Sequence, residues 1–174
     1  MRKAGTIAMK IFAVVGRSNS GKTTLVEKLV RHYTRGGLKV STIKSIRHDY
    51  EMDHPGKDSY RHREAGAFSS AITSGKKFSL ISTIDDDMTP LELAQRYFSH
   101  SDLVIIEGYK EGDTQKIEVV GDSSEDPLFL SGVDNILLVA SDNSLETVLP
   151  QYRRDDVEGI LRGIEDLILK TTNT

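Results

Sequence analysis

The stretch "KIFAVVGRSNSGKTTLVEKLV", residues 10–30, joins an apolar run to an amphipathic run through a glycine-rich loop. The apolar run, residues 10–15, is typical of a buried parallel strand. Apolar residues at 3.6-residue spacing predict a helix over 22–35, ended by two glycines. The loop between them reads Gly, four residues, then Gly-Lys-Thr, which is the spacing of a loop that holds phosphates. The alternative is a glycine-rich turn that binds nothing.

The residue types of this loop suit phosphate binding. Glycines allow backbone angles that other residues avoid, so backbone N–H groups and the N-terminus of the next helix can converge on phosphate oxygens. Lys22 would reach the β- and γ-phosphates, and the Thr23 hydroxyl would bind Mg²⁺. The residues predicted to bind a nucleotide here are Gly16, Arg17, Ser18, Asn19, Ser20, Gly21, Lys22, Thr23 and Thr24.

An acid follows a second apolar run, "DLVIIEG", residues 102–108. A phosphate loop needs a carboxylate at the end of a neighbouring strand to hold Mg²⁺ or its water, and Glu107 has this position. Gly108 leaves room for a backbone N–H beside a γ-phosphate. We predict that Thr23 and Glu107 bind the metal and that Lys22 and Glu107 are catalytic. The alternative is that Glu107 only ends a strand near solvent.

A long polar loop, residues 44–58, follows the strand predicted over 39–44. Ligands of doubly wound sheets bind at the carboxyl ends of strands, and long polar loops in compact domains tend to be functional. Asp49 is predicted to bind Mg²⁺ through water or to position the attacking water, and so joins the catalytic and metal sets. The alternative is a solvated loop without a ligand. Lys44, Arg47 and Lys57 could meet a second, anionic group. The residues predicted to face a second ligand are Lys44, His48, Asp53, Lys57, Asp58 and Arg61.

Base recognition is assigned to the end of a late strand. The Asn-Lys-x-Asp sequence with which Ras-like GTPases read guanine is absent. Asp142 follows the apolar run over 135–141 and is predicted to accept hydrogen bonds from N1 and N2 of guanine. A turn-forming aspartate is the alternative, and the residues do not decide between them.

Strands and helices alternate along the rest of the chain. The patterns predict strands over 67–74, 78–84 and 116–120, and helices over 58–65, 90–98 and 155–170. This alternation predicts an α/β fold of the P-loop NTPase type, three layers deep, with a mostly parallel sheet and helices on both faces.

The composition limits the kinds of partner. The 174 residues predict one nucleotide-binding domain over 9–174 after an N-terminal extension, 1–8, with 111–131 as a candidate insertion or dimerisation region. A net charge of −3 gives no electrostatic case for nucleic acid. No apolar run is long enough to span a bilayer, and cysteine is absent. We expect a cytoplasmic protein without a membrane or nucleic-acid partner.

The sequence resembles the molybdopterin-guanine dinucleotide biosynthesis protein B family, MobB, from Met9 to about Leu169. The resemblance depends on "GRSNSGKTTL" (16–25), "DHPGKDSYRHREAGA" (53–67) and "DLVIIEGYK" (102–110), of which the second is the most specific. Two features depart from the family. Ser45, Ile46 and Arg47 replace much of a histidine-rich run, and Arg17 stands where small or aromatic residues are common.

The resemblance implies a GTP-binding protein, usually a homodimer, with Mg²⁺ and weak GTPase activity. It implies a role in converting the molybdenum cofactor to its guanine dinucleotide form, where a separate guanylyltransferase partner catalyses the nucleotidyl transfer. The molybdenum cofactor itself is a candidate second ligand. Two alternatives stay open: a P-loop small-molecule kinase, and a nucleotide-binding scaffold or metallochaperone without turnover.

Overall fold

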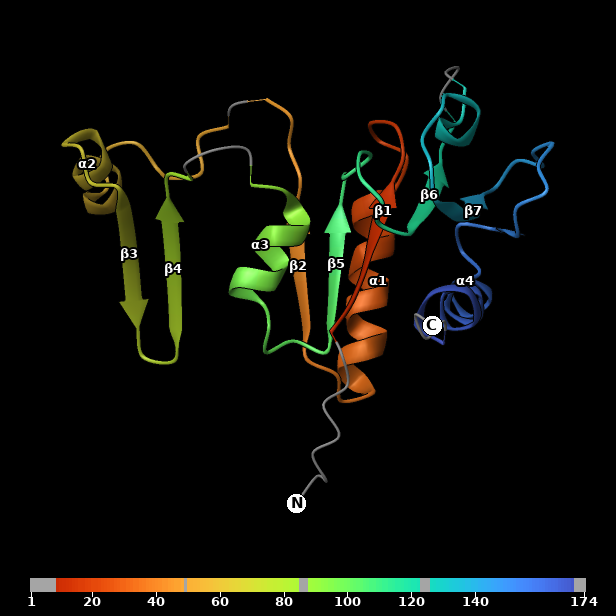
Figure 1. Ribbon diagram of the computed structural model, residues 1–174, viewed down its shortest axis with the longest axis horizontal. Coiled ribbons are helices and arrows are strands. Elements are labelled where there is room, and N and C mark those ends of the chain that lie inside the picture. The colour runs from red at the N-terminus through yellow and green to blue at the C-terminus, as the bar shows by residue number, and fades with distance from the viewer. Residues whose placement is uncertain (1–8, 49, 85–87, 123–125, 171–174) are drawn as a thin grey trace. The chain divides into compact units, whose positions relative to one another are not determined.

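A computed structural model describes residues 9–48, 50–84, 88–122 and 126–170 (Figure 1). Contacts between residues divide the chain into two compact units. The first, Met1–Ser45 with Pro90–Thr174, contains the sheet and the glycine-rich loop, and we call it the P-loop unit. The second, Ile46–Thr89, contains one helix and one hairpin, and we call it the hairpin unit. Each is described by itself.

The P-loop unit is built on a six-stranded parallel sheet in the order β2-β5-β1-β6-β7-β8. The strands expected from the sequence are all present, with ends shifted by a residue at most. The two-residue strand β8 was not predicted, because so short a strand has no sequence period. The strands are β1 (Lys10–Val15), β2 (Val40–Lys44), β5 (Leu103–Glu107), β6 (Lys116–Val120), β7 (Ile136–Ser141) and β8 (Gln151–Tyr152).

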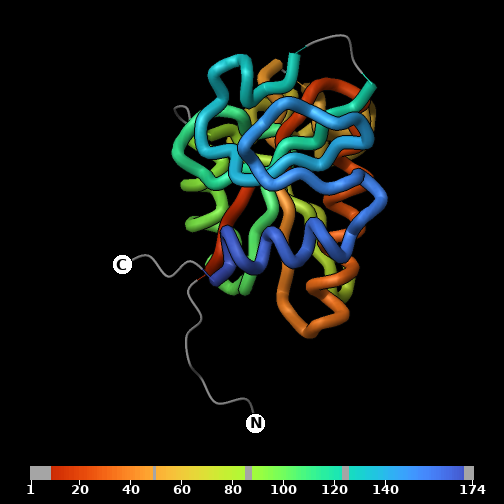
Figure 2. The backbone as a smooth tube through the Cα atoms, turned by 90° about the vertical axis from the view of Figure 1, so that its right-hand side faces the viewer, coloured from red at the N-terminus to blue at the C-terminus, as the bar shows by residue number. Residues whose placement is uncertain are grey.

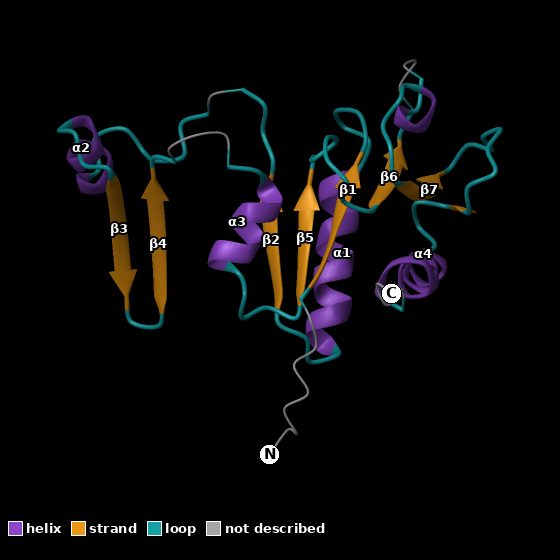
Figure 3. Ribbon diagram, in the orientation of Figure 1, coloured by secondary structure: helices purple, strands orange, loops and turns teal. Residues whose placement is uncertain are grey.

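Helices cover both faces of this sheet (Figure 3). On one face α1 (Lys22–Arg35) and α4 (Val157–Ile164) pack against alternate strand residues such as Phe12 and Val14. On the other face α3 (Pro90–Tyr97) and the short helix η1 (Leu128–Leu130) pack with the residues between them, such as Ala13. The predicted three-layer α/β/α fold is therefore confirmed.

The C-terminal helix differs from the prediction. Instead of one helix over 155–170, α4 ends at Ile164 and continues as the π-helix η2 (Glu165–Leu169). Asp156 precedes α4 and its side chain accepts a hydrogen bond from the Gly159 N–H at 2.9 Å, which fixes the start of the helix. In Figure 2 this stretch, in blue, lies toward the viewer. Within the described residues, no helix is both long and apolar enough to cross a bilayer.

The strand β6 lies inside the stretch 111–131 and is an internal strand of the sheet, between β1 and β7. Two of its charged residues are buried. Lys116 donates hydrogen bonds to the carbonyl oxygens of Gly112, Thr114 and Asp134 at 2.8–3.0 Å. Whether the rest of this stretch contacts a second copy of the chain stays a prediction.

The hairpin unit contains α2 (Asp58–Glu64) and the antiparallel strands β3 (Ser69–Ser74) and β4 (Lys77–Ser82), so the predicted hairpin is confirmed. Gly75 makes the turn with a φ of 56°, a left-handed conformation that favours glycine. The residue before α2 is Lys57, which makes no side-chain cap, and Asp58 is already in the first turn.

Candidate nucleotide-binding site

The glycine-rich loop leaves β1 and enters α1 in a conformation that only glycine fits at two positions. Gly16 has a φ of 151°, and a Cβ there would lie against the carbonyl oxygen of Val119 and 2.6 Å from the Ser20 Oγ. Gly21, with a φ of 100°, turns the chain into the first residue of α1. The backbone therefore bends tightly at the helix N-terminus, as phosphate binding requires.

Lys22 is folded back over the loop. Its Nζ donates a hydrogen bond to the carbonyl oxygen of Arg17 at 2.6 Å. Burial lowers the pKa of the Lys22 ammonium, and the neighbouring charges of Lys110 and Lys44 lower it further, while Glu107 acts in the opposite direction. A bound phosphate would stabilise the charged form of Lys22 against burial and against the repulsion from Lys44 and Lys110, because it supplies an anionic acceptor in place of the neutral carbonyl.

Thr23 and Glu107 meet, as the sequence predicted for a metal-binding pair. The Thr23 hydroxyl donates a hydrogen bond to the Glu107 Oε1 at 2.8 Å. Glu107 ends β5, paired with Val14 of β1 on one side and Lys44 of β2 on the other, which places its carboxylate at the carboxyl edge of the sheet. A hydroxyl and a carboxylate are oxygen ligands that suit Mg²⁺, which usually completes its shell with water and phosphate oxygens.

No group of three or more metal-binding side chains occurs in the part of the chain that the structure describes. Asp49, the third residue predicted for the metal, lies outside the described residues. The Gly108 N–H, predicted to approach a γ-phosphate, donates instead to the Val14 carbonyl at 2.9 Å. Gly108 is nevertheless needed there, because its φ is 93° and a Cβ would come 2.8 Å from the Ser45 carbonyl oxygen.

A cavity of about 510 Å³, which we call the phosphate cavity, lies over the loop. Its lining brings together most of the predicted phosphate and metal residues with Lys44 from β2. The lining residues are Ser18, Asn19, Gly21, Lys22, Thr23, Thr24, Lys44, Ser45, Glu107 and Gly108.

Arg17 contacts a different part of the P-loop unit. Its Nη2 donates to the Asp126 carbonyl oxygen at 3.1 Å and to the Ser131 Oγ at 3.2 Å. Glu118 holds the same segment, since its carboxylate accepts the N–H groups of Leu128 at 2.6 Å and Phe129 at 3.1 Å. These contacts tie the loop to the turn around η1. Direct binding of a nucleotide by Arg17 stays a prediction.

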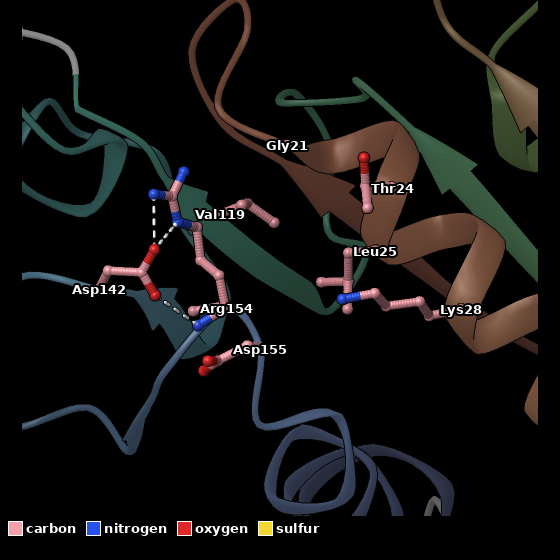
Figure 4. A pocket seen from close by; sticks show the side chains of 9 residues that line it. Gly21, Thr24, Leu25, Lys28, Val119, Asp142, Arg154 and Asp155 are labelled. Atoms are coloured by element: carbon pink, nitrogen blue, oxygen red, sulfur yellow. Dashed lines mark hydrogen bonds and ion pairs between the residues drawn. The ribbon is translucent and has the colours of Figure 1, made fainter.

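A second cavity, of about 310 Å³, lies beside the first turn of α1 and shares Gly21 and Thr24 with the phosphate cavity. We call it the nucleoside cavity (Figure 4). Asp142, just after β7, lines this cavity, and its reading of a base stays a prediction. Arg154, which the sequence analysis did not single out, binds this carboxylate: its Nε lies 2.7 Å and its Nη2 2.6 Å from Oδ2. These hydrogen bonds lower the pKa of Asp142.

The residues predicted for a second ligand are divided between the two units. Lys44 lines the phosphate cavity, while His48, Asp53, Lys57, Asp58 and Arg61 belong to the hairpin unit. There the Asp53 Oδ1 accepts hydrogen bonds from the Ser59 hydroxyl at 3.1 Å and the His54 N–H at 2.8 Å. Asp53 thus holds the start of α2, and a common ligand for this group stays a prediction.

Arg63 binds the loop before α2 and was also missed. Its Nη2 lies 2.6 Å from the Glu51 Oε1, and its Nε 3.8 Å from the Asp53 Oδ2. The segment "DHPGKDSYRHREAGA" therefore has a structural use in the hairpin unit, because three of its side chains, Asp53, Ser59 and Arg63, connect α2 to the preceding loop.

The parallel sheet, the loop between β1 and α1, and the acid at the end of β5 define an α/β protein of the P-loop NTPase-like fold. The profile of the family "Molybdopterin guanine dinucleotide synthesis protein B" matches residues 11–142. The chain belongs to this family, MobB.

Two similar proteins align with most of the chain. It is 34% identical over 161 residues to the molybdopterin-guanine dinucleotide biosynthesis adapter protein of Escherichia coli (strain K12), covering 90% of this chain and 92% of the relative. It is 31% identical over 134 residues to the protein of the same name from Haemophilus influenzae, covering 76% and 74%.

Solved structures agree with the family assignment. A crystal structure of molybdopterin-guanine biosynthesis protein B superposes with a TM-score of 0.72 at 29% identity, over 92% of this chain and 99% of that chain. A Bacillus subtilis MobB structure superposes with a TM-score of 0.70 at 28% identity, over 88% and 97%.

Proposed function

We propose that this protein is a GTP-binding adapter in the synthesis of molybdopterin-guanine dinucleotide. The relatives that cover most of the chain carry the adapter name. The single observation that supports nucleotide binding best is the Thr23–Glu107 hydrogen bond of 2.8 Å beside Lys22. This arrangement provides oxygen ligands for Mg²⁺ next to a cation and a helix N-terminus, which together suit a magnesium–triphosphate.

The nucleotide would span the two cavities of the P-loop unit. Its phosphates and Mg²⁺ would occupy the phosphate cavity, with Thr23 and Glu107 as metal ligands. Its ribose and base would then enter the nucleoside cavity, because the two cavities meet at Gly21 and Thr24. The floor of the nucleoside cavity includes the apolar side chains of Leu25 and Val119, which suits the face of a purine.

The proposed hydrolysis is weak and depends on positioning. Lys22 and backbone N–H groups would neutralise the charge that develops on the transferred phosphoryl group. Mg²⁺ would be held by Thr23 and Glu107, with Asp49 as the residue proposed to orient the attacking water. In the structure Glu107 accepts the Thr23 hydrogen bond, so its proposed role is metal binding rather than proton abstraction.

The proposed partners are a molybdopterin guanylyltransferase and a second copy of the chain. Phe68, Ile72 and Phe78 of the hairpin unit are more than half exposed, at 57%, 55% and 78%. Large apolar side chains exposed on a hairpin are typical of a protein–protein interface. The molybdenum cofactor stays a proposed second ligand.

The test is a binding titration with Mg²⁺-GTP. Lys22→Ala should lower the affinity at least about tenfold, because it removes a charge-assisted contact worth roughly 1.5–3 kcal/mol. The matched control is Lys76→Ala, at an exposed position of the hairpin turn, which should bind as the wild type does. Unchanged binding by Lys22→Ala would refute the assignment.

Product analysis separates the proposed GTPase from the alternatives. Labelled GTP should give labelled inorganic phosphate, slowly, in the presence of Mg²⁺. Label recovered on an acceptor molecule would identify a kinase. Binding without any phosphate release, even with the guanylyltransferase present, would identify a scaffold without turnover.

A further inference from the structure

Arg154 joins the P-loop to the ends of β6 and β7, and its side chain lines the nucleoside cavity (Figure 4). Its Nη2 lies 2.6 Å from the Asp142 Oδ2 and 3.5 Å from the Asp122 Oδ2. Its Nη1 lies 3.4 Å from the Ser20 carbonyl oxygen. The Arg154 guanidinium thus pairs with two carboxylates, Asp122 and Asp142, which follow neighbouring strands. Of the Arg154 side chain, 27% is exposed.

The Asp142 carboxylate has little capacity left for a ligand. Two oxygens offer about four acceptor positions. Oδ2 accepts a hydrogen bond from the Arg154 Nε and its other side is occupied by the Nη2, an ion-pair contact of 2.6 Å, while Oδ1 accepts from the Arg154 backbone N–H at 3.2 Å. Reading guanine through N1–H and N2–H needs one acceptor on each oxygen. The observed contacts leave one acceptor position, on Oδ1, so Asp142 cannot make both bonds while it holds Arg154.

Arg154, which lines the nucleoside cavity, has N–H groups that Asp142 does not accept. A guanidinium has five N–H groups, of which two belong to Nη1. Among the described residues Nη1 has one acceptor, the Ser20 carbonyl at 3.4 Å, and the second partner of Nη2, Asp122, is 3.5 Å away. Both contacts are at the outer limit of hydrogen-bond range, so a better acceptor can replace either one at small cost.

We propose that Arg154 selects the base of the bound nucleotide by donating hydrogen bonds to the 6-oxo edge of a purine, with Asp142 as the residue that positions Arg154. The O6 and N7 of guanine are both acceptors that match the fork of an arginine, whereas adenine carries an amino donor at position 6. This inference rests on the proposed GTP binding and names the residue that gives it specificity.

The proposal differs from recognition by Asp142 in one measurable respect. Inosine keeps the O6 and N7 of guanine and lacks its 2-amino group. Recognition by Arg154 therefore treats guanine and inosine alike. Recognition by Asp142 depends on the 2-amino group, whose loss removes a hydrogen bond to a charged acceptor worth roughly 1.5–3 kcal/mol, about tenfold or more.

The experiment measures Mg²⁺-GDP, Mg²⁺-IDP and Mg²⁺-ADP by calorimetric titration into the full chain. For the wild type we expect GDP and IDP to agree within about threefold and ADP to bind about tenfold more weakly, the lower part of the range for an arginine–guanine pair. Arg154→Gln should bring all three affinities together. Arg154→Lys, which keeps the charge without the fork, should fall between them, and thermal unfolding will confirm that both variants fold.

The neighbouring Arg153 provides the matched control. Its Nε pairs with Asp155 at 3.1 Å and 65% of its side chain is exposed, so Arg153→Gln should keep the wild-type order of nucleotides. Asp142→Asn should reduce the preference for GDP without creating one for XDP, the xanthine nucleotide.

Three results would overturn the proposal. These are a GDP affinity tenfold or more above that of IDP, a switch of Asp142→Asn to XDP, and equal wild-type affinities for GDP and ADP. Failure of the proposed function would look different, because none of the nucleotides would then bind to the wild type.

Discussion

At the residue scale, Gly16 shows how one missing side chain shapes the candidate site. A Cβ at this position would overlap the Val119 carbonyl oxygen, which belongs to β6 and cannot move without breaking the sheet. We expect Gly16→Ala to lower the free energy of unfolding by about 2 kcal/mol or more and to abolish nucleotide binding, because positive φ alone costs roughly 1–2 kcal/mol.

The control for this prediction is Gly132→Ala. Gly132 also has a positive φ, 79°, but a Cβ there would meet nothing within 4 Å. Gly132→Ala should lower the free energy of unfolding only by the cost of a positive φ and should bind the nucleotide as the wild type does. Urea unfolding and GDP titration of both variants measure the difference, and equal effects would contradict the steric account.

Glu118 gives a prediction on pH. Burial raises the pKa of its carboxyl above the ordinary value of 4.5, against the two backbone N–H groups that it accepts. An acid with a raised pKa in the folded state stabilises the fold fully below the unfolded pKa, and this contribution is lost as the pH rises through the folded pKa. As the pH rises from 4.5, the free energy of unfolding of the wild type should fall relative to that of Glu118→Gln, because only the wild type loses this contribution.

Urea unfolding between pH 4.5 and 8 measures this difference in stability. The matched control is Asn143→Gln, at an exposed position without a titratable group, whose difference in stability from the wild type should stay constant. If Glu118→Gln also gives a constant difference, the carboxyl does not titrate differently in the two states.

At the scale of elements, the hairpin β3–β4 exposes two large apolar side chains on one face of β4. Phe78 and Leu80 are two residues apart and therefore share a face, and they are 78% and 44% exposed. If this hairpin contributes to the proposed dimer, the double change Phe78→Ser and Leu80→Ser should weaken self-association at least about tenfold, because it removes two large apolar side chains from an interface.

Sedimentation of a dilution series measures the dimer constant. Lys77→Ser, next to Phe78, is the control and should leave it unchanged. A wild type that stays monomeric at high concentration would contradict the proposed homodimer, and an unaffected double variant would place the interface elsewhere.

The sequence of strand β6 does not indicate that the strand is internal to the sheet. Its sequence "KIEVV" carries two charges, which usually indicate a strand with one face in solvent. In the structure it is internal, and both charges are buried with partners: Lys116 with three carbonyl oxygens and Glu118 with two N–H groups. Gly112 and Thr114 come just before the strand, whereas Asp134, Leu128 and Phe129 come from the segment between β6 and β7. No periodic pattern in the sequence reveals these partners.

At the scale of the whole molecule, the division into two units predicts which residues a bound nucleotide would protect from hydrogen exchange. All the residues that line the phosphate and nucleoside cavities belong to the P-loop unit. We expect saturating Mg²⁺-GDP to slow hydrogen exchange at residues 16–24 and around Arg154. Stabilisation by ligand should reach about 2.7 kcal/mol at a hundred times the dissociation constant.

The hydrogen-exchange experiment has an internal control. The strands β3 and β4 should keep their exchange rates in the monomer, and Lys22→Ala should show weaker protection than the wild type at the same nucleotide concentration. Protection confined to the hairpin unit would contradict the proposed site.

The parts of the candidate nucleotide site were predictable from local sequence patterns, because they depend on contacts between neighbours along the chain. Gly16, Gly21, Lys22 and Thr23 lie within eight residues, and the apolar period of the flanking strand and helix predicts what they connect. Glu107 was also predictable, since an acid directly after four apolar residues marks the end of a buried strand. The parallel three-layer fold followed from the alternation of strands and helices.

The side chains that surround the candidate site could be identified only from the folded chain. Arg154 lies 12 residues beyond Asp142, in a stretch without helical or strand period, and sheet order alone brings the two together. Arg17 proved to bind the turn around η1, more than 100 residues away, rather than standing unpaired in its loop. Polar contacts of this kind have no sequence period, because a hydrogen bond depends on the position of two atoms and the chain between them is unconstrained.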